Sequence, residues 1–177
     1  MKKFLFLAAA LLAAGTLSAA EALKINGNFK LLDKKTNLPS LWLKNGNGAK
    51  DAAFEVVKDG ENNIYKFVSQ GKHTAIYTAM SFPAADGDQF EFVLTAKGKA
   101  EEICMGVYTY DSANKYIAIS SEKLAIDSPD AFKEYKAVVT VKPKGDMKTA
   151  KIRVFIGGFS KGFDVQIKEI RVTPVAK

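Results

Sequence analysis

One arginine and five aromatic side chains are the residues of this chain that could bind a sugar. A pyranose offers axial hydrogens to a flat apolar ring and hydroxyls to hydrogen-bonding groups, so aromatic residues beside polar ones meet both needs. The candidate ligand-binding residues are Trp42, Tyr77, Tyr108, Tyr110, Arg153 and Phe155. Arg153 and Phe155 share one face of an alternating segment. Tyr108 and Tyr110 share a face with Gly106, where the missing side chain leaves room for a ligand to approach.

A purely structural interpretation of each candidate stays open at this stage. Trp42 is the only tryptophan and follows Leu38-Pro39, which also suits a residue that plugs one end of a core. The two tyrosines could be half-buried residues with their hydroxyls in water. Arg153 could be an ordinary surface charge, and Phe155 could be covered by a neighbouring loop.

The remaining reactive side chains do not form a catalytic pattern. His73 is the only histidine, which excludes a metal site of several histidines, and we expect it at the surface or in a turn. Ser69 lies four residues before it without a recognised nucleophile motif. No spacing singles out a pair of carboxylates of the kind that glycosidases use. The acidic residues considered for such a pair are Glu91, Glu101, Glu102 and Glu134. We therefore predict no enzyme and assign no metal or other cofactor.

The elements that must position the candidates are strands. Period-two stretches rich in Val, Ile, Phe, Tyr and Thr recur between turn residues, and helical periodicity is nearly absent. We predict about ten strands, near 24–32, 53–58, 63–69, 73–82, 90–96, 102–110, 115–121, 135–141, 151–156 and 163–173. Many strands at short spacing favour an all-β fold, an antiparallel two-sheet β-sandwich.

Three local features make this prediction specific. Lys97-Gly98 is predicted to be a turn between two strands. Ser128-Pro129-Asp130 is predicted to start a single helical turn, with the serine as its cap. In the last strand the apolar phase changes between Lys168 and Glu169, which predicts a β-bulge there.

The first twenty residues have the pattern of an export signal. Lys2 and Lys3 precede an apolar run over 4–14, and Ser18-Ala19-Ala20 supplies small residues for a signal peptidase. We predict a helical signal peptide over 1–20 and one domain over 21–177, exported to the periplasm or the extracellular space. The apolar run is too short to cross a bilayer, so no membrane span is expected.

The net charge and its distribution limit the classes of molecule that this chain is expected to bind. The formal net charge is +7, from 26 basic and 19 acidic residues, but the lysines are scattered. Nucleic-acid binding, which usually needs a concentrated basic patch, is not expected. The excess could simply keep the protein soluble, or it could attract acidic glycans and anionic envelope polymers.

The single cysteine, Cys104, cannot form an intrachain disulfide. It is predicted to be a buried, inert thiol, the alternative being an exposed reactive one.

The order of several short motifs resembles the carbohydrate-binding modules of the family 4/9 type. Asn26-Gly27-Asn28-Phe29, then Leu38-Pro39 and Trp42, is similar to the opening of that family. The later segments that resemble it are Phe90 to Gly98, Val107 to Asp111 with Asn114-Lys115, Phe132 to Val141, and Ile167 to Val172.

This resemblance implies a galactose-binding-like jelly roll that often holds a structural calcium ion and sometimes a sugar. The chain departs from the family at two acidic positions, where Asn28 and Lys168 stand in place of aspartates. Because calcium takes six to eight oxygen ligands, these changes argue against assigning the ion.

Three functions follow from these observations, in decreasing order of support. The leading hypothesis is non-catalytic binding of a polysaccharide by the exported domain. The alternative is an envelope domain that is structural or binds proteins and has no sugar site. A small jelly-roll glycosidase or lyase is the least favoured.

Overall fold

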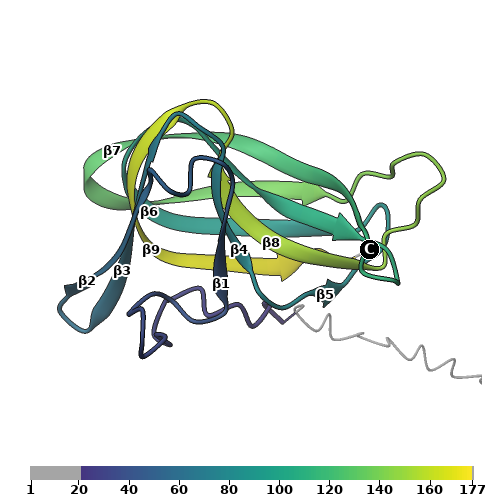
Figure 1. Cartoon of the computed structure of the whole chain (residues 1–177), viewed down its shortest axis with the longest axis horizontal. Helices are drawn as coiled ribbons and strands as arrows, with labels where there is room; N and C mark the ends of the chain where they lie inside the picture. The colour runs from purple at the N-terminus through teal and green to yellow at the C-terminus, as the bar shows by residue number, and fades with distance from the viewer. Residues whose placement is uncertain (1–20, 177) are drawn as a thin grey trace, which may run out of the picture.

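The computed structural model describes residues 21–176 and is all-β, with no helix in that range (Figure 1). Its strands are β1 (Trp42–Asn45), β2 (Ala53–Asp59), β3 (Asn62–Gln70), β4 (Thr74–Thr78), β5 (Phe82–Pro83), β6 (Gln89–Tyr110), β7 (Tyr116–Thr140), β8 (Lys151–Gly158) and β9 (Gly162–Pro174). Within 21–176 nothing helical is long and apolar enough to cross a membrane. The predicted signal-peptide helix lies outside the described residues.

The strands form one antiparallel sheet that curls on itself. Its order is β1-β4-β8-β6-β9-β3-β2, with β5 paired to β8 and β7 paired to β6. The predicted two sheets are therefore two halves of one continuous sheet, which fits a jelly roll. They are joined because β6 pairs with β9 along residues 90–100 and with β8 along residues 104–110. We call the part made of β1, β4, β8 and the adjoining lengths of β6 and β7 the first half, and the part containing β9, β3 and β2 the second half.

Gly98 allows a bend within β6, although the sequence predicts a turn at this glycine. Gly98 has a φ of +126°, and a Cβ there would lie 2.2 Å from the carbonyl oxygen of Asp164. The pairing of β6 with β7 shifts register on both sides of this point, between Ala96 and Gly98 and between Ala100 and Ile103. The predicted turn at Lys97-Gly98 is therefore wrong. Gly98 lets the chain change direction without leaving the sheet.

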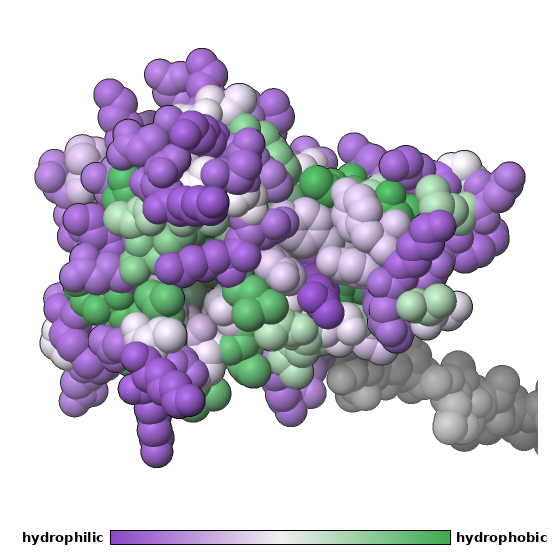
Figure 2. Space-filling model, viewed as in Figure 1, coloured by the Kyte–Doolittle hydropathy of each residue, from purple (hydrophilic) through white to green (hydrophobic). Residues whose placement is uncertain are grey.

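The core lies between the two halves, where alternate side chains meet. Ile76 of β4, Met105 of β6 and Ile156 of β8 belong to the same buried cluster as Phe67 of β3 and Val165 of β9. Alternation along each strand leaves the other side chains on the outer surface. Hydrophilic side chains cover much of the visible surface, with separate apolar patches between them (Figure 2). The outer face of the first half is only partly exposed, because it holds a second, smaller buried cluster of Ala75, Cys104, Tyr108 and Phe155.

Two further predicted elements are wrong. Residues 24–32 form no strand, because Asn26 and Phe29 have φ values of +52° and +54°. The apolar residues that suggested a strand, Ile25 and Phe29, are instead buried individually in the core. Ser128-Pro129-Asp130 forms no helical turn but continues β7, with the Ser128 hydroxyl donating to the carbonyl of Ala131 at 2.6 Å.

Other boundaries also differ from the prediction. The segments 90–96 and 102–110 are one strand, β6, and 115–121 and 135–141 lie in one strand, β7. Residues 73–82 separate into β4 and β5, and the short strand β1 was not predicted.

The predicted bulge in β9 is confirmed. Glu169 pairs with Thr95, whereas Ile167 pairs with the next residue, Ala96, so Lys168 is the extra residue. Both Ile167 and Ile170 consequently reach the core.

Candidate functional site

The outer face of the first half gathers most of the predicted ligand-binding residues. Register pairing places Tyr77 of β4 opposite Phe155 of β8, and Arg153 of β8 opposite Tyr108 of β6. Tyr110 lies two residues further along β6 on the same face. Five of the six predicted residues therefore come from three neighbouring strands. We call these five, together with Tyr116, the tyrosine face.

Phe155 forms the buried base of the tyrosine face. Its ring stacks on that of Tyr108 with centroids 4.5 Å apart and planes at 20°. Phe155 is fully buried and Tyr108 is 5% exposed. The ring has space because Gly106, directly opposite on β6, has no side chain: a Cβ there would lie 2.8 Å from the Phe155 ring. Phe155 thus supports Tyr108 and does not itself offer a surface to a ligand.

Arg153 lies between two partly exposed tyrosines. Its guanidinium carbon is 5.3 Å from the ring centroid of Tyr110 and 5.8 Å from that of Tyr77. Such placements over aromatic rings hold a guanidinium in position and add a modest cation–π attraction. The structure therefore brings Arg153, Tyr77 and Tyr110 together on one surface.

Tyr116 belongs to this group and was missed by the sequence analysis. It begins β7, is 49% exposed, and contacts Tyr110 and Tyr108 with centroids 6.0 and 6.4 Å apart. Its pairing opposite Tyr110 across the hairpin is the signal that would have found it.

The tyrosine hydroxyls are held protonated. Burial raises the pKa of Tyr108, Tyr110 and Tyr116 above the ordinary value of 10.0, although Arg153 partly offsets this for the pKa of Tyr110. The Asn45 side-chain amide donates to the Tyr108 hydroxyl at 3.2 Å. At neutral pH each hydroxyl can therefore both donate and accept a hydrogen bond.

The aromatic contacts continue to the far end of β8. Phe155 touches Phe159 at 6.0 Å, and Phe159 stacks on His73 at 5.0 Å. His73 is half-buried just before β4, and burial lowers its pKa below 6.5. The imidazole is consequently neutral at pH 7 and adds no charge to this end of the face.

Trp42 does not join the tyrosine face. Its side chain is 8% exposed, belongs to the core cluster and donates through Nε1 to the carbonyl of Asn26 at 3.3 Å. Its ring lies 6.3 Å from that of Phe29. Trp42 therefore has the position of the core plug that the sequence left open as the structural interpretation.

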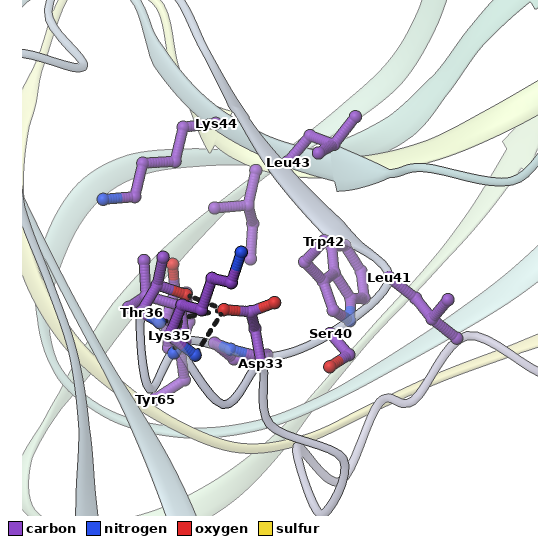
Figure 3. A pocket seen from close by; sticks show the side chains of 12 residues that line it. Asp33, Lys35, Thr36, Ser40, Leu41, Trp42, Leu43, Lys44 and Tyr65 are labelled. Carbon is purple, nitrogen blue, oxygen red and sulfur yellow. Dashed lines mark hydrogen bonds between the residues drawn. The ribbon is translucent and has the colours of Figure 1, made fainter.

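A pocket of about 510 Å³ lies beside Trp42, between β1 and the segment around residues 33–40 (Figure 3). Asp33 lies inside it and accepts hydrogen bonds from the Thr36 hydroxyl and from the backbone amides of Lys35 and Thr36. These bonds lower the pKa of Asp33. The carboxylate thus shapes its own loop, and this pocket shares none of its lining with the tyrosine face.

Cys104 is buried, as predicted, with 1% exposure beside Phe155, Tyr108 and Ala75. Burial raises the pKa of its thiol. The thiol form therefore predominates at neutral pH, which suits a packing role.

The calcium ion that the family resemblance implies does not fit the residues present. Asn28, Lys168 and Glu169 border one small pocket, so an ammonium group and an amide stand where acidic ligands would be needed. Across residues 21–176, no three Asp, Glu, His or Cys side chains gather closely enough to hold a metal.

Comparison with known proteins shows the fold. No family model matches the sequence, and no curated protein matches it. A family 11 carbohydrate-binding module from a cellulosomal cellulase of Clostridium thermocellum is similar in structure, with a TM-score of 0.58 and 17% identity over 90% of this chain and 98% of that one.

Two further carbohydrate-binding modules are similar to this chain in structure. A family 4 carbohydrate-binding module has a TM-score of 0.53 and 13% identity, covering 85% of this chain and 98% of that one. The xylan-binding family 22 module of Paenibacillus barcinonensis Xyn10C has a TM-score of 0.57 and 9% identity, covering 90% and 97%. The chain therefore has the fold of carbohydrate-binding modules. At these identities the likeness concerns the fold alone.

Proposed function

We propose that the protein is a non-catalytic carbohydrate-binding module that holds a polysaccharide on its tyrosine face. The observation that carries this proposal is the position of Arg153 between Tyr77 and Tyr110, the second of which contacts the exposed ring of Tyr116. Exposed rings beside a hydrogen-bonding cation supply both kinds of contact that a sugar in water needs.

Contacts within the sheet order the side chains of the tyrosine face in the absence of a ligand. Tyr108 is fixed by the ring of Phe155 beneath it and by the amide of Asn45, and Arg153 is held between rings. A site whose side chains are already ordered loses less conformational entropy on binding. A glycan would add ring stacking and hydroxyl hydrogen bonds without a rearrangement of the strands.

The comparisons support this proposal through the fold. Three structurally similar proteins are carbohydrate-binding modules, one of them described as xylan-binding. Membership of the family 4/9 type rests on the ordered motifs of the sequence, and a family 4 structure is among the similar ones. The basic and apolar start of the chain adds the proposal that the module is exported, to the periplasm or beyond the cell.

Tyrosine variants test the proposal. Affinity for the best ligand of a polysaccharide panel should fall about tenfold for Tyr110→Ala and for Tyr116→Ala, a loss of about 1.4 kcal/mol each. Phe132→Ala is the matched control, because Phe132 is a half-buried aromatic residue that also contacts cations but lies outside the tyrosine face. Loss of affinity in the control equal to that in the tyrosine variants would refute the site. No binding to any polysaccharide would refute the function.

Binding of an envelope protein is the second candidate, and it would use the exposed leucines at and before β1. Leu31, Leu41 and Leu43 are 60%, 38% and 43% exposed at and before β1. A protein partner of this edge would be lost on Leu41→Asp, whereas glycan binding by the tyrosine face would not.

A further inference from the structure

The tyrosine face carries positive charge without a matching negative charge. Register pairing and alternation place sixteen residues of the first half on its outer surface, and none of these described residues is acidic. They are Leu43, Asn45, Ala75, Tyr77, Cys104, Gly106, Tyr108, Tyr110, Tyr116, Ile119, Ser121, Lys123, Lys151, Arg153, Phe155 and Gly157.

Two acidic groups lie near the border of this surface, and neither forms an ion pair with Arg153. Glu102 pairs with Lys123 at 2.8 Å, and Asp111, just past the end of β6, accepts from the Lys115 amide at 2.8 Å. Lys151 donates to the neutral side chain of Asn114 at 2.9 Å. These contacts leave the charge of Arg153 unbalanced by any ion pair within residues 21–176.

A ligand that covers the tyrosine face must replace the water around Arg153. A buried charge that loses water without gaining a counter-charge is costly, whereas a guanidinium and a carboxylate or sulfate form strong, often bidentate hydrogen bonds. The tyrosine rings beside Arg153 stabilise the cation but do not neutralise it.

We propose that the polysaccharide bound here is anionic, and that Arg153 contacts a carboxylate or sulfate group of a sugar lying on Tyr77 and Tyr110. This inference rests on the proposed function and specifies its ligand. The rings would stack against the sugar, and Arg153 would favour sugars that carry a negative charge.

The decisive comparison uses one polymer in two charge states. Polygalacturonate and its fully methyl-esterified form have the same backbone, but only the first presents free carboxylates. We expect the protein to bind polygalacturonate at least tenfold more tightly, with this preference lost in Arg153→Gln. Arg171→Gln is the matched control and should keep the preference, because Arg171 lies on β9 in the second half and pairs with Glu134.

Dextran sulfate beside neutral dextran forms the second arm and distinguishes sulfate from carboxylate. A preference for either anionic polymer that depends on Arg153 supports the inference and identifies the anion. Equal binding of charged and neutral forms would overturn it while leaving the proposed function intact. A preference that survives in Arg153→Gln, or is lost equally in Arg171→Gln, would also overturn it, since overall charge would then explain the binding.

A salt titration gives a readout that does not depend on any variant folding. The dissociation constant for the anionic polymer should rise with sodium chloride, and that for its neutral form should not. Absence of salt dependence would contradict the inference. Failure to bind these polymers and every neutral polysaccharide would instead refute the proposed function itself.

Discussion

The tyrosine face and the pocket beside Trp42 both combine aromatic rings with basic side chains, but only the tyrosine face leaves several of its rings partly exposed. On the tyrosine face the rings stand on paired strands and contact one another, so that Tyr77, Tyr110 and Tyr116 remain partly exposed. In the pocket, Trp42 is turned into the core and Asp33 is engaged by its own loop. Strand alternation places Tyr77 and Tyr110 on the outer surface, whereas Trp42 of β1 has the opposite phase and enters the core.

The largest effect is expected at the pocket. Trp42→Ala should lower the free energy of unfolding by about 3–5 kcal/mol, because it removes a large ring from the core next to an existing hollow. Chemical denaturation measures this loss. The dissociation constant of the folded protein for a glycan should stay the same. A higher dissociation constant with little change in stability would mean that the Trp42 pocket, and not the tyrosine face, binds the glycan.

A smaller and different effect is expected beneath the tyrosine face. Phe155→Leu keeps an apolar side chain under Tyr108 but removes the stacked ring. Unfolding free energy should fall by about 1 kcal/mol, and glycan affinity should fall about fivefold as Tyr108 loses its support. Calorimetric titration and denaturation of the same sample separate the two quantities. Unchanged affinity would mean that Tyr108 takes no part in binding.

The smallest effect concerns His73 at the far end of the tyrosine face. Burial lowers its pKa below 6.5 in the folded protein, so folding favours the neutral imidazole. This contribution to stability is complete above the unfolded pKa and is lost as the pH falls through the folded one. Stability should therefore decline from about pH 7 to pH 5 less steeply in His73→Gln than in the original chain. Identical slopes would show that the imidazole is not desolvated.

Alternation predicted most of the strands, because β9 and the first residues of β6 bury every second side chain. The bulge at Lys168 was predictable for the same reason: Ile167 and Ile170 could both reach the core only if the phase changed between them. Residues 24–32 were mispredicted because apolar side chains spaced along a loop can enter a core one by one. The continuity of β6 was hidden because Gly98 reads locally as a turn, although contact with β9 keeps it in the sheet.

Strand alternation also explains which residues of the candidate site could be predicted from the sequence. Arg153, Tyr108 and Tyr110 were brought together because they share a face on paired strands. Trp42 was placed with them on residue type alone, and its position in the core depends on the path of the loop before β1. Tyr116 was missed because its closeness to Tyr110 arises from hairpin pairing, which single-strand patterns do not reveal.

Chemical-shift mapping of the protein during titration with its best polysaccharide ligand tests the central claim most directly. The account predicts that the perturbed signals belong to outward residues of β4, β8, β6 and β7, with Tyr77, Tyr110, Tyr116 and Arg153 the most affected. Perturbations confined to residues 33–44 around the Trp42 pocket, with the tyrosine face unchanged, would contradict it.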